Sequence, residues 1–264
     1  METVVFTRGE RVERGNNIQY YAYQARNGTV FFVKIDSLFK GDIYVTFEGN
    51  KVRADESWTG EIRSRAVHGD ELYFRTKDYE NRGEEMIYKA SFHPSSGIKI
   101  DFVRDMEKDE EGFDSMMLLR EKNGVESVSQ AWSDESIVVD VDKKELMEYL
   151  LIGVHKKKLI YVKNSRNATT SAEAISPNVT VITVGGSFSG DYMDDSSPLI
   201  YLLADWINLI VVNTNTMEVR SFGTSVNGEK GSFFNISGVH EGKICVLGEE
   251  EDANYLYTAK IPVK

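Results

Sequence analysis

The stretch Leu209 to Phe222, LIVVNTNTMEVRSF, contains two strand-like segments joined by a polar turn. Its first half is a run of aliphatic and β-branched residues, and from Met217 onward apolar and polar side chains alternate. Residues of the first kind are enriched in strands, and alternation with a period of two is typical of a strand with one buried face. Thr214-Asn215-Thr216 provides turn-forming side chains between them. The stretch therefore predicts an antiparallel pair of strands.

Short apolar runs recur along the whole chain at nearly constant spacing. Their starts differ by 42, 44, 43, 40 and 45 residues. A period of roughly 40 to 45 residues accommodates four short strands with their turns, which is the size of one β-propeller blade. A helical repeat of this length would show apolar residues at i, i+3, i+4 and i+7 instead. The runs are Val30–Val33, Leu72–Arg75, Met116–Leu119, Leu159–Val162, Leu199–Leu202 and Ile244–Leu247.

A tight turn precedes most of these runs at an equivalent place. Asn27-Gly28 is a strong hairpin signal because a type I′ turn needs positive φ at both central positions. We expect each turn to join the inner strand of a blade to its second strand. The segments are Ala25-Arg26-Asn27-Gly28, Ala66-Val67-His68-Gly69, Gly153-Val154-His155-Lys156 and Gly238-Val239-His240-Glu241.

These repeats resemble the WD40-like blades of the β-propeller superfamily, and Leu209 to Phe222 resembles the outer half of one blade. The WD dipeptide and the Gly-His signature are absent, so no specific family follows. The resemblance implies an all-β fold, with residues 1–264 forming a single β-propeller domain of about six four-stranded antiparallel blades. Five or seven blades also fit, because Arg104 to Glu111 and Asn164 to Ser197 lack clear strands. We expect Met1 to Thr7 to pair beside Tyr255 to Ile261, so that the two terminal strands close one blade.

Composition narrows the classes of partner and the compartment. The formal net charge is −11, from 31 Lys and Arg against 42 Asp and Glu, which predicts repulsion from nucleic acid and from anionic membranes. Cys245 is the only cysteine, which suits a reducing compartment. Met1 to Glu10 lacks the apolar run of a signal peptide. We therefore expect a cytoplasmic protein that binds neither nucleic acid nor membrane.

The usual catalytic and cofactor motifs are not found in the sequence. It has no G-x-G-x-x-G, no G-x-x-x-x-G-K-[ST] and no serine placed as in a nucleophile elbow. His68, His155 and His240 are 87 and 85 residues apart, but inner-strand ends surround a channel too wide for one shared zinc ion. Whether these histidines share a site stays open. We predict no catalytic residues, no metal and no cofactor.

Acidic and aromatic residues in the predicted loops indicate a binding surface. In a four-stranded blade, the loops between blades and those between second and third strands lie on one face. An acidic face of this kind would attract a basic protein or peptide, and an exposed Trp would anchor it. We expect Trp132 and Trp206, in contrast, to pack between blades. The predicted binding residues are Trp58, Asp109, Glu110, Glu111, Glu249, Glu250 and Glu251.

The sequence thus favours a non-enzymatic scaffold that binds a protein or peptide through its acidic connector loops. The alternative is a propeller enzyme, a glycosidase or metal-dependent hydrolase, with acidic residues around the central channel. Paired carboxylates need only meet in space, so sequence spacing does not exclude a glycosidase. A carbohydrate-binding module is a third hypothesis, and it requires exposed aromatic side chains.

Overall fold

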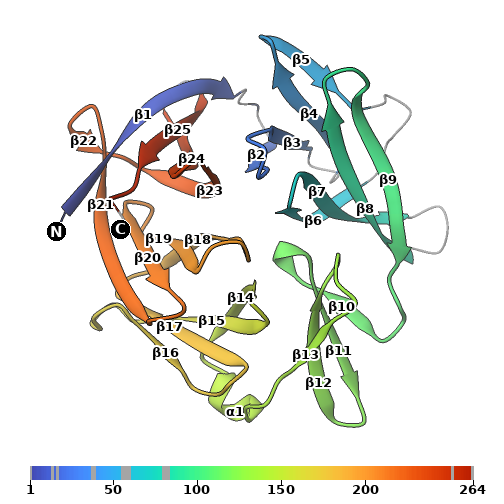
Figure 1. The fold of residues 1–264 in the computed structure, drawn as a ribbon, viewed down its shortest axis with the longest axis vertical. Coiled ribbons are helices and arrows are strands. Elements are labelled where there is room, and N and C mark those ends of the chain that lie inside the picture. The colour runs from blue at the N-terminus through green and yellow to red at the C-terminus, as the bar shows by residue number, and fades with distance from the viewer. Residues whose placement is uncertain are drawn as a thin grey trace.

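The computed structural model describes residues 2–12, 15, 18–36, 40–54, 61–78, 84–250 and 253–262. Its strands form short sheets arranged in a ring around a common centre (Figure 1). The all-β propeller predicted from the repeats is confirmed. The only α-helix among the described residues, α1 (Lys143–Leu146), is one turn long and is capped by Asp142, whose Oδ1 accepts a hydrogen bond from the amide of Lys144.

Three sheets have four antiparallel strands that follow one another in chain order. In the third sheet, a 3-10 turn, η1 (Asp114–Met116), lies between the first strand and the second. The first sheet contains β2 (Gln19–Gln24), β3 (Val30–Ile35), β4 (Gly41–Phe47) and β5 (Asn50–Arg53). The second contains β6 (Glu61–His68), β7 (Glu71–Asp78), β8 (Glu84–His93) and β9 (Gly97–Asp105), and the third β10 (Glu110–Gly112), β11 (Met117–Lys122), β12 (Val125–Gln130) and β13 (Ser136–Val138).

The fourth sheet departs from the predicted antiparallel order. It runs β14 (Leu150–His155), β15 (Lys158–Asn164), β17 (Val179–Val184) and β16 (Ser171–Ala174), with β15 and β17 parallel. The reason is burial. The sequence VTVITV of β17 is almost entirely buried, whereas the SAEA sequence of β16 is mostly exposed. Because a central strand must be apolar on both faces, the later strand occupies the inner position and the earlier one the edge.

A nine-stranded sheet joins the end of the chain to its beginning. The predicted strand pair is present within it, with Leu209 opposite Phe222. The order is β18 (Phe188–Met193), β19 (Leu199–Ala204), β20 (Asn208–Asn213), β21 (Glu218–Val226), β1 (Glu2–Val12), β25 (Asn254–Lys260), β24 (Lys243–Glu249) and β23 (Phe233–His240), and β22 (Glu229–Lys230) pairs with β21.

Strand β1 closes the ring, in a register different from the predicted one. Residues 7–12 pair antiparallel with β25, with Thr7 opposite Thr258 and Val12 opposite Asn254. Residues 2–6 pair parallel with β21 instead, from Glu2 opposite Phe222 onward. The pairing of the two terminal strands is therefore confirmed, but most of the segment predicted to make it lies against β21.

The innermost segments of the ring touch one another in cyclic order. β2 contacts β6, β6 contacts η1, η1 contacts β14, β14 contacts β18, β18 contacts β23, and β23 contacts β2. All six aligned apolar runs lie in the neighbouring strands, which are β3, β7, β11, β15, β19 and β24, with Met116 just ahead of β11. The inner-to-second-strand hairpins are confirmed at all four predicted turns.

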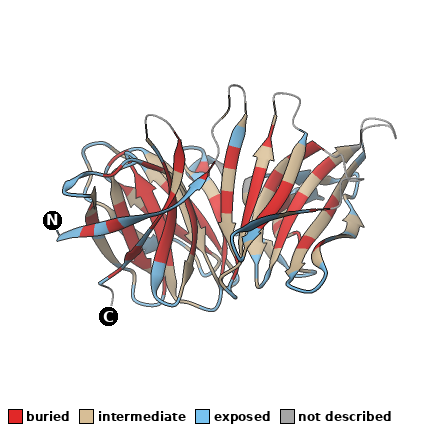
Figure 2. Ribbon diagram, turned by 90° about the horizontal axis from the view of Figure 1, so that it is seen from above, coloured by how far each residue is buried: buried red, intermediate tan, exposed pale blue. Residues whose placement is uncertain are grey.

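Hydrophobic clusters fill the spaces between neighbouring sheets. For example, Phe31 and Ile43 of the first sheet pack with Leu72 and Phe74 of the second. Figure 2 shows that buried residues run through the strands and that exposed residues concentrate at the turns. Within the described part of the chain, no helix has the length and hydropathy needed to span a membrane.

Candidate binding site in the central channel

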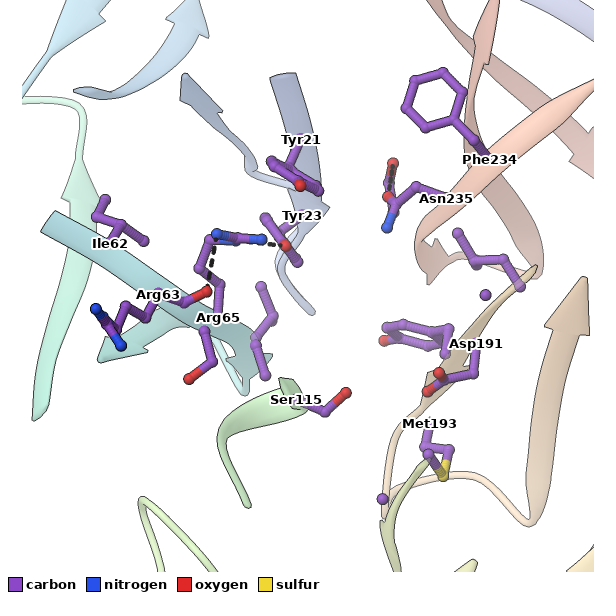
Figure 3. A pocket seen from close by; sticks show the side chains of 18 of the residues that line it. Tyr21, Tyr23, Ile62, Arg63, Arg65, Ser115, Asp191, Met193, Phe234 and Asn235 are labelled. Atoms are coloured by element: carbon purple, nitrogen blue, oxygen red, sulfur yellow. Dashed lines mark hydrogen bonds between the residues drawn. The ribbon is translucent and has the colours of Figure 1, made fainter. Parts of the chain in front are cut away.

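The inner strands surround a cavity of about 430 Å³ at the centre of the ring. Side chains from β2, β6, β14, β18 and β23 line it, together with Ser115 of η1, Gln130 of β12 and the following Trp132. Figure 3 shows side chains from opposite walls pointing into this space. Its volume lies within the range of about 300 to 1,000 Å³ that is typical of small-molecule pockets.

β-Bulges interrupt four of the inner strands where they line the cavity. In β6 the register shifts between Ile62 and Arg65, and in β18 between Phe188 and Gly190. β23 has two such shifts and β14 has one. A bulge turns side chains away from the regular alternation and is frequent next to functional sites. The bulges bring Ser64 of β6 and Ser189 of β18 to the cavity wall.

Two serine hydroxyls of the cavity wall have no hydrogen-bond partner among the described residues. They are the Oγ atoms of Ser64 and Ser189, and both are buried. The whole Ser64 residue is only 2% exposed. A buried hydroxyl without a partner costs about 1–3 kcal/mol, so native structures contain few of them. The cavity wall therefore has hydrogen-bonding capacity that the protein itself does not use.

One wall of the cavity carries a positive charge that aromatic side chains hold in place. Arg65 of β6 donates from Nε to the Tyr23 hydroxyl over 2.9 Å and from Nη1 to the carbonyl of Arg63 over 3.3 Å. Its guanidinium carbon lies 4.1 Å from the centre of the Tyr21 ring. Hydrogen bonds and a cation–π contact together fix the orientation of this guanidinium group.

The opposite wall carries a negative charge and an amide. Asp191 of β18 and Asn235 of β23 point into the cavity from the side facing Arg65 (Figure 3). Tyr192 also lines this wall, and burial, reinforced by the nearby Asp194 carboxylate, raises the pKa of its hydroxyl to about 12. The Tyr192 hydroxyl therefore stays protonated at neutral pH.

Trp132 and the turn residues His68 and Asp194 line a smaller pocket at the end of the inner strands. The His68 and Trp132 rings are stacked, with their centres 4.9 Å apart, between the second and third sheets. The inter-blade packing predicted for Trp132 is confirmed. Beyond it, Arg26 of the β2–β3 turn donates to Asp194 of the β18–β19 loop over 3.1 Å. This ion pair joins turns of two inner strands, β2 and β18, that are both neighbours of β23 in the ring.

The three histidines at the hairpins have separate environments. His155 is buried, with Nε2 2.9 Å from the Ser197 carbonyl, whereas Nδ1 of His240 lies 2.8 Å from the carbonyl of Arg26. His68 stacks on Trp132 as described. Within the described residues, no three His, Cys, Asp or Glu side chains are placed to hold one metal ion.

The predicted acidic residues near 110 are largely engaged in ion pairs. Glu110 has a side chain only 5% exposed, and it receives hydrogen bonds from both Nη atoms of Arg104 over 2.8 and 3.1 Å. Arg120 contacts Glu110 and also Asp109, whose side chain is 50% exposed. Glu111 is exposed. Of this group, only Asp109 and Glu111 present a carboxylate to solvent.

The remaining predicted binding residues lie partly outside the described part of the chain. Trp58 and Glu251 fall outside the described residues. Glu249 is exposed at the end of β24. Glu250 accepts hydrogen bonds from Arg8 over 3.0 Å and from the Tyr257 hydroxyl over 2.6 Å. That these acidic residues and Trp58 bind a partner stays a prediction.

Trp206 does not pack between blades as predicted, since it is 59% exposed. Asp205 and Trp206 form the two-residue turn between β19 and β20, with φ of 50° and 60°. The Trp206 carbonyl accepts a hydrogen bond from the amide of Phe233 at the start of β23. We call the side of the ring that carries this turn and the starts of the inner strands the connector face. The sequence offered only a weak signal for this turn, since Asp tolerates positive φ but Trp rarely adopts it.

Comparison with known proteins adds little to this description. No protein-family model matches the sequence, and no curated protein matches it. Two similar solved structures are Sqt1 of Saccharomyces cerevisiae and the mitotic checkpoint complex, each 10% identical to this chain. The Sqt1 match covers 86% of this chain and 67% of that chain with a TM-score of 0.34. The other covers 95% and 79% with a TM-score of 0.47, so neither adds to what the ring of sheets shows.

Proposed function

We propose that this propeller is a non-enzymatic scaffold that binds a protein or peptide on its connector face. Trp206 carries the proposal. Its side chain is 59% exposed on a short turn, so a large aromatic surface is available to a partner. The hydrogen bond from the Phe233 amide to the Trp206 carbonyl links the turn to the start of β23. Trp is enriched among the residues that dominate binding energy at protein interfaces, and a fixed turn loses little entropy on binding.

We propose further that the ring has six blades, with the nine-stranded sheet containing two of them. Six inner segments contact each other in cyclic order, and the described residues form six buried hydrophobic clusters. In the nine-stranded sheet, β18 to β21 would form one blade, and β23 to β25 with β1 the other. The parallel contact between β21 and β1 would then be a junction between blades.

We propose that the partner segment is basic. Glu111 and Glu249 are exposed, and the chain carries a net charge of −11. Such a charge raises the association rate of a cationic partner and makes binding sensitive to salt. Arg8 pairs with Glu250, and Arg104 and Arg120 pair with Glu110, so these arginines neutralise part of the acidic charge on the connector loops.

Selection from a random peptide library on the immobilised protein tests this function. We expect enriched peptides to carry Lys or Arg and to bind Trp206→Ala at least about tenfold more weakly, because truncating a central aromatic anchor costs about 2 kcal/mol or more. Changing both Glu111 and Glu249 to Lys should weaken binding mainly at low salt. Phe102→Ala is the matched control, since Phe102 is an exposed aromatic residue on the outer strand β9.

Two outcomes would contradict the proposal. One is that no peptide is enriched. The other is that enriched peptides bind Trp206→Ala and wild-type protein equally, which would place the binding surface elsewhere. Peptides that are acidic rather than basic would leave the Trp206 anchor in place but refute the charge argument.

A further inference from the structure

We propose that the central cavity binds a small zwitterion, such as a free amino acid or a dipeptide, with its carboxylate at Arg65 and its ammonium group at Asp191. Its charged residues, Arg65 of β6 and Asp191 of β18, line the inner walls and differ from Trp206 on the connector face. The two sites therefore make separate predictions.

The hydrogen-bonding groups of the wall suit a polar ligand rather than an apolar one. The Oγ atoms of Ser64 and Ser189 are buried without partners among the described residues, and both residues line the space. They come from different sheets, and both lie at β-bulges. A ligand that offers a donor or an acceptor at both places would satisfy groups that the fold leaves unsatisfied.

Arg65 determines the anionic end of the ligand. Its guanidinium group is fixed by the Tyr23 hydroxyl at 2.9 Å, by the Arg63 carbonyl and by the face of the Tyr21 ring. A planar guanidinium held in one orientation recognises carboxylates and phosphates with little further loss of entropy. The aromatic side chains around it lower the local polarity and strengthen the interaction.

Asp191 distinguishes a zwitterion from a simple anion. It points into the cavity from the wall that faces Arg65 (Figure 3). A phosphate-rich ligand would be repelled by this carboxylate and by the net charge of −11. A ligand with a cationic group at its other end would instead be attracted by the Asp191 carboxylate. The cavity volume of about 430 Å³ suits one amino acid or a dipeptide rather than a long chain.

Thermal unfolding in the presence of defined probes tests the proposal. The probes are the proteinogenic amino acids, glycylglycine, succinate, inorganic phosphate and glucose, each raised to about 10 mM, well above a Kd of about 1 mM. We expect at least one amino acid or the dipeptide to raise the unfolding temperature of wild-type protein in a saturable manner. Calorimetric titration of that probe then gives the affinity.

Variants assign the two ends of the ligand. We expect Arg65→Gln and Asp191→Asn each to weaken the titrated probe at least about tenfold, since each removes one charged partner. Ser64→Ala should weaken it less and should stabilise the empty protein, because it removes an unsatisfied hydroxyl. Arg53→Gln is the control, as Arg53 lies on the outer strand β5 and pairs with Asp42. If Arg65→Gln does not fold, the affinities of Asp191→Asn and Ser64→Ala for the probe test the proposal.

The proposal is overturned if no amino acid and no dipeptide binds. It is also overturned if succinate, phosphate or glucose binds in their place, or if Asp191→Asn binds the probe as tightly as wild-type protein does. Loss of peptide binding in Trp206→Ala has no bearing on these results, so the two proposals fail separately.

Discussion

His155 is a single residue whose environment makes stability depend on pH. The residue is 1% exposed at the end of β14. Nε2 lies 2.9 Å from the Ser197 carbonyl, which only accepts hydrogen bonds, so the proton of the neutral ring resides on Nε2. Burial lowers the pKa of this imidazole below its ordinary value of 6.5, although the Ser197 carbonyl and Asp195 oppose the shift.

We therefore expect the free energy of unfolding to fall as the pH drops below 6.5. In that range the unfolded chain binds a proton at His155 that the folded chain does not, so stability rises with pH by at most about 1.4 kcal/mol per unit for one group. His155→Gln should show a shallower slope between pH 7 and pH 5 in urea unfolding. His93→Gln, at an exposed turn, should keep the wild-type slope, and equal slopes in all three proteins would refute the argument.

Residue chemistry also explains why the central cavity could not be found from the sequence. Arg63-Ser64-Arg65 has the alternation of a surface strand, and no motif distinguishes it. Only the bulge between Ile62 and Arg65 turns Ser64 into the wall. The aromatic partners of Arg65 come from β2, some 40 residues earlier, and Asp191 comes from β18. Contacts between distant inner strands depend on the closure of the ring, which a local pattern does not specify.

At the scale of the elements, burial determined how far the sequence could be interpreted. The six apolar runs identified the second strand of each repeat because those strands are buried on both faces. The strand order of the fourth sheet was harder to predict. Ser171 to Ala174 is a polar edge strand, and the later segment Val179 to Val184 lies between it and β15. Trp206 was expected to pack between blades because it lies at the end of a strand, but a two-residue turn leaves its side chain in solvent.

The junction of β9 and β10 yields a prediction for Glu110. Burial alone would raise the pKa of its carboxyl group, but hydrogen bonds from Arg104 and from the amide of Glu107, with the charge of Arg120, lower it overall. We expect Glu110→Ala to lower the free energy of unfolding by about 2–3 kcal/mol, because it leaves both partly buried arginines without this carboxylate. Urea unfolding at neutral pH measures the change.

Glu111→Ala is the matched control for this junction, because the adjacent Glu111 side chain is exposed. Its effect should stay within about 0.5 kcal/mol. The stabilisation by Glu110 should persist above pH 4.5, the ordinary pKa of the group, and disappear as the pH falls through its lower folded value. Equal losses of unfolding free energy in the two variants would show that the ion pairs of Glu110 do not stabilise the segment between β9 and β10.

At the scale of the whole molecule, stability depends on β1 because it pairs with strands from both sides of the closure. Val4 and Phe6 are buried against the β21 side, and Val12 is buried near β25. The Phe6 and Phe233 rings lie 4.6 Å apart. Without β1, two strand edges and the surrounding apolar surface would be open to solvent, and an exposed edge recruits other chains.

Deleting residues 2–12 should therefore both destabilise the protein and change its association state. We expect the variant to unfold at a temperature at least about 10 °C lower and to form oligomers, because β21 and β25 lose their shared partner. Phe6→Ala should keep the association state of the wild-type protein and lose about 3 kcal/mol, whereas Val5→Ala, at a position 63% exposed, should change little. Light scattering with size-exclusion chromatography measures association, and thermal unfolding measures stability. A deletion variant with the association state and stability of the wild-type protein would mean that the ring does not need its terminal strand, and that closure by β1 has no energetic role.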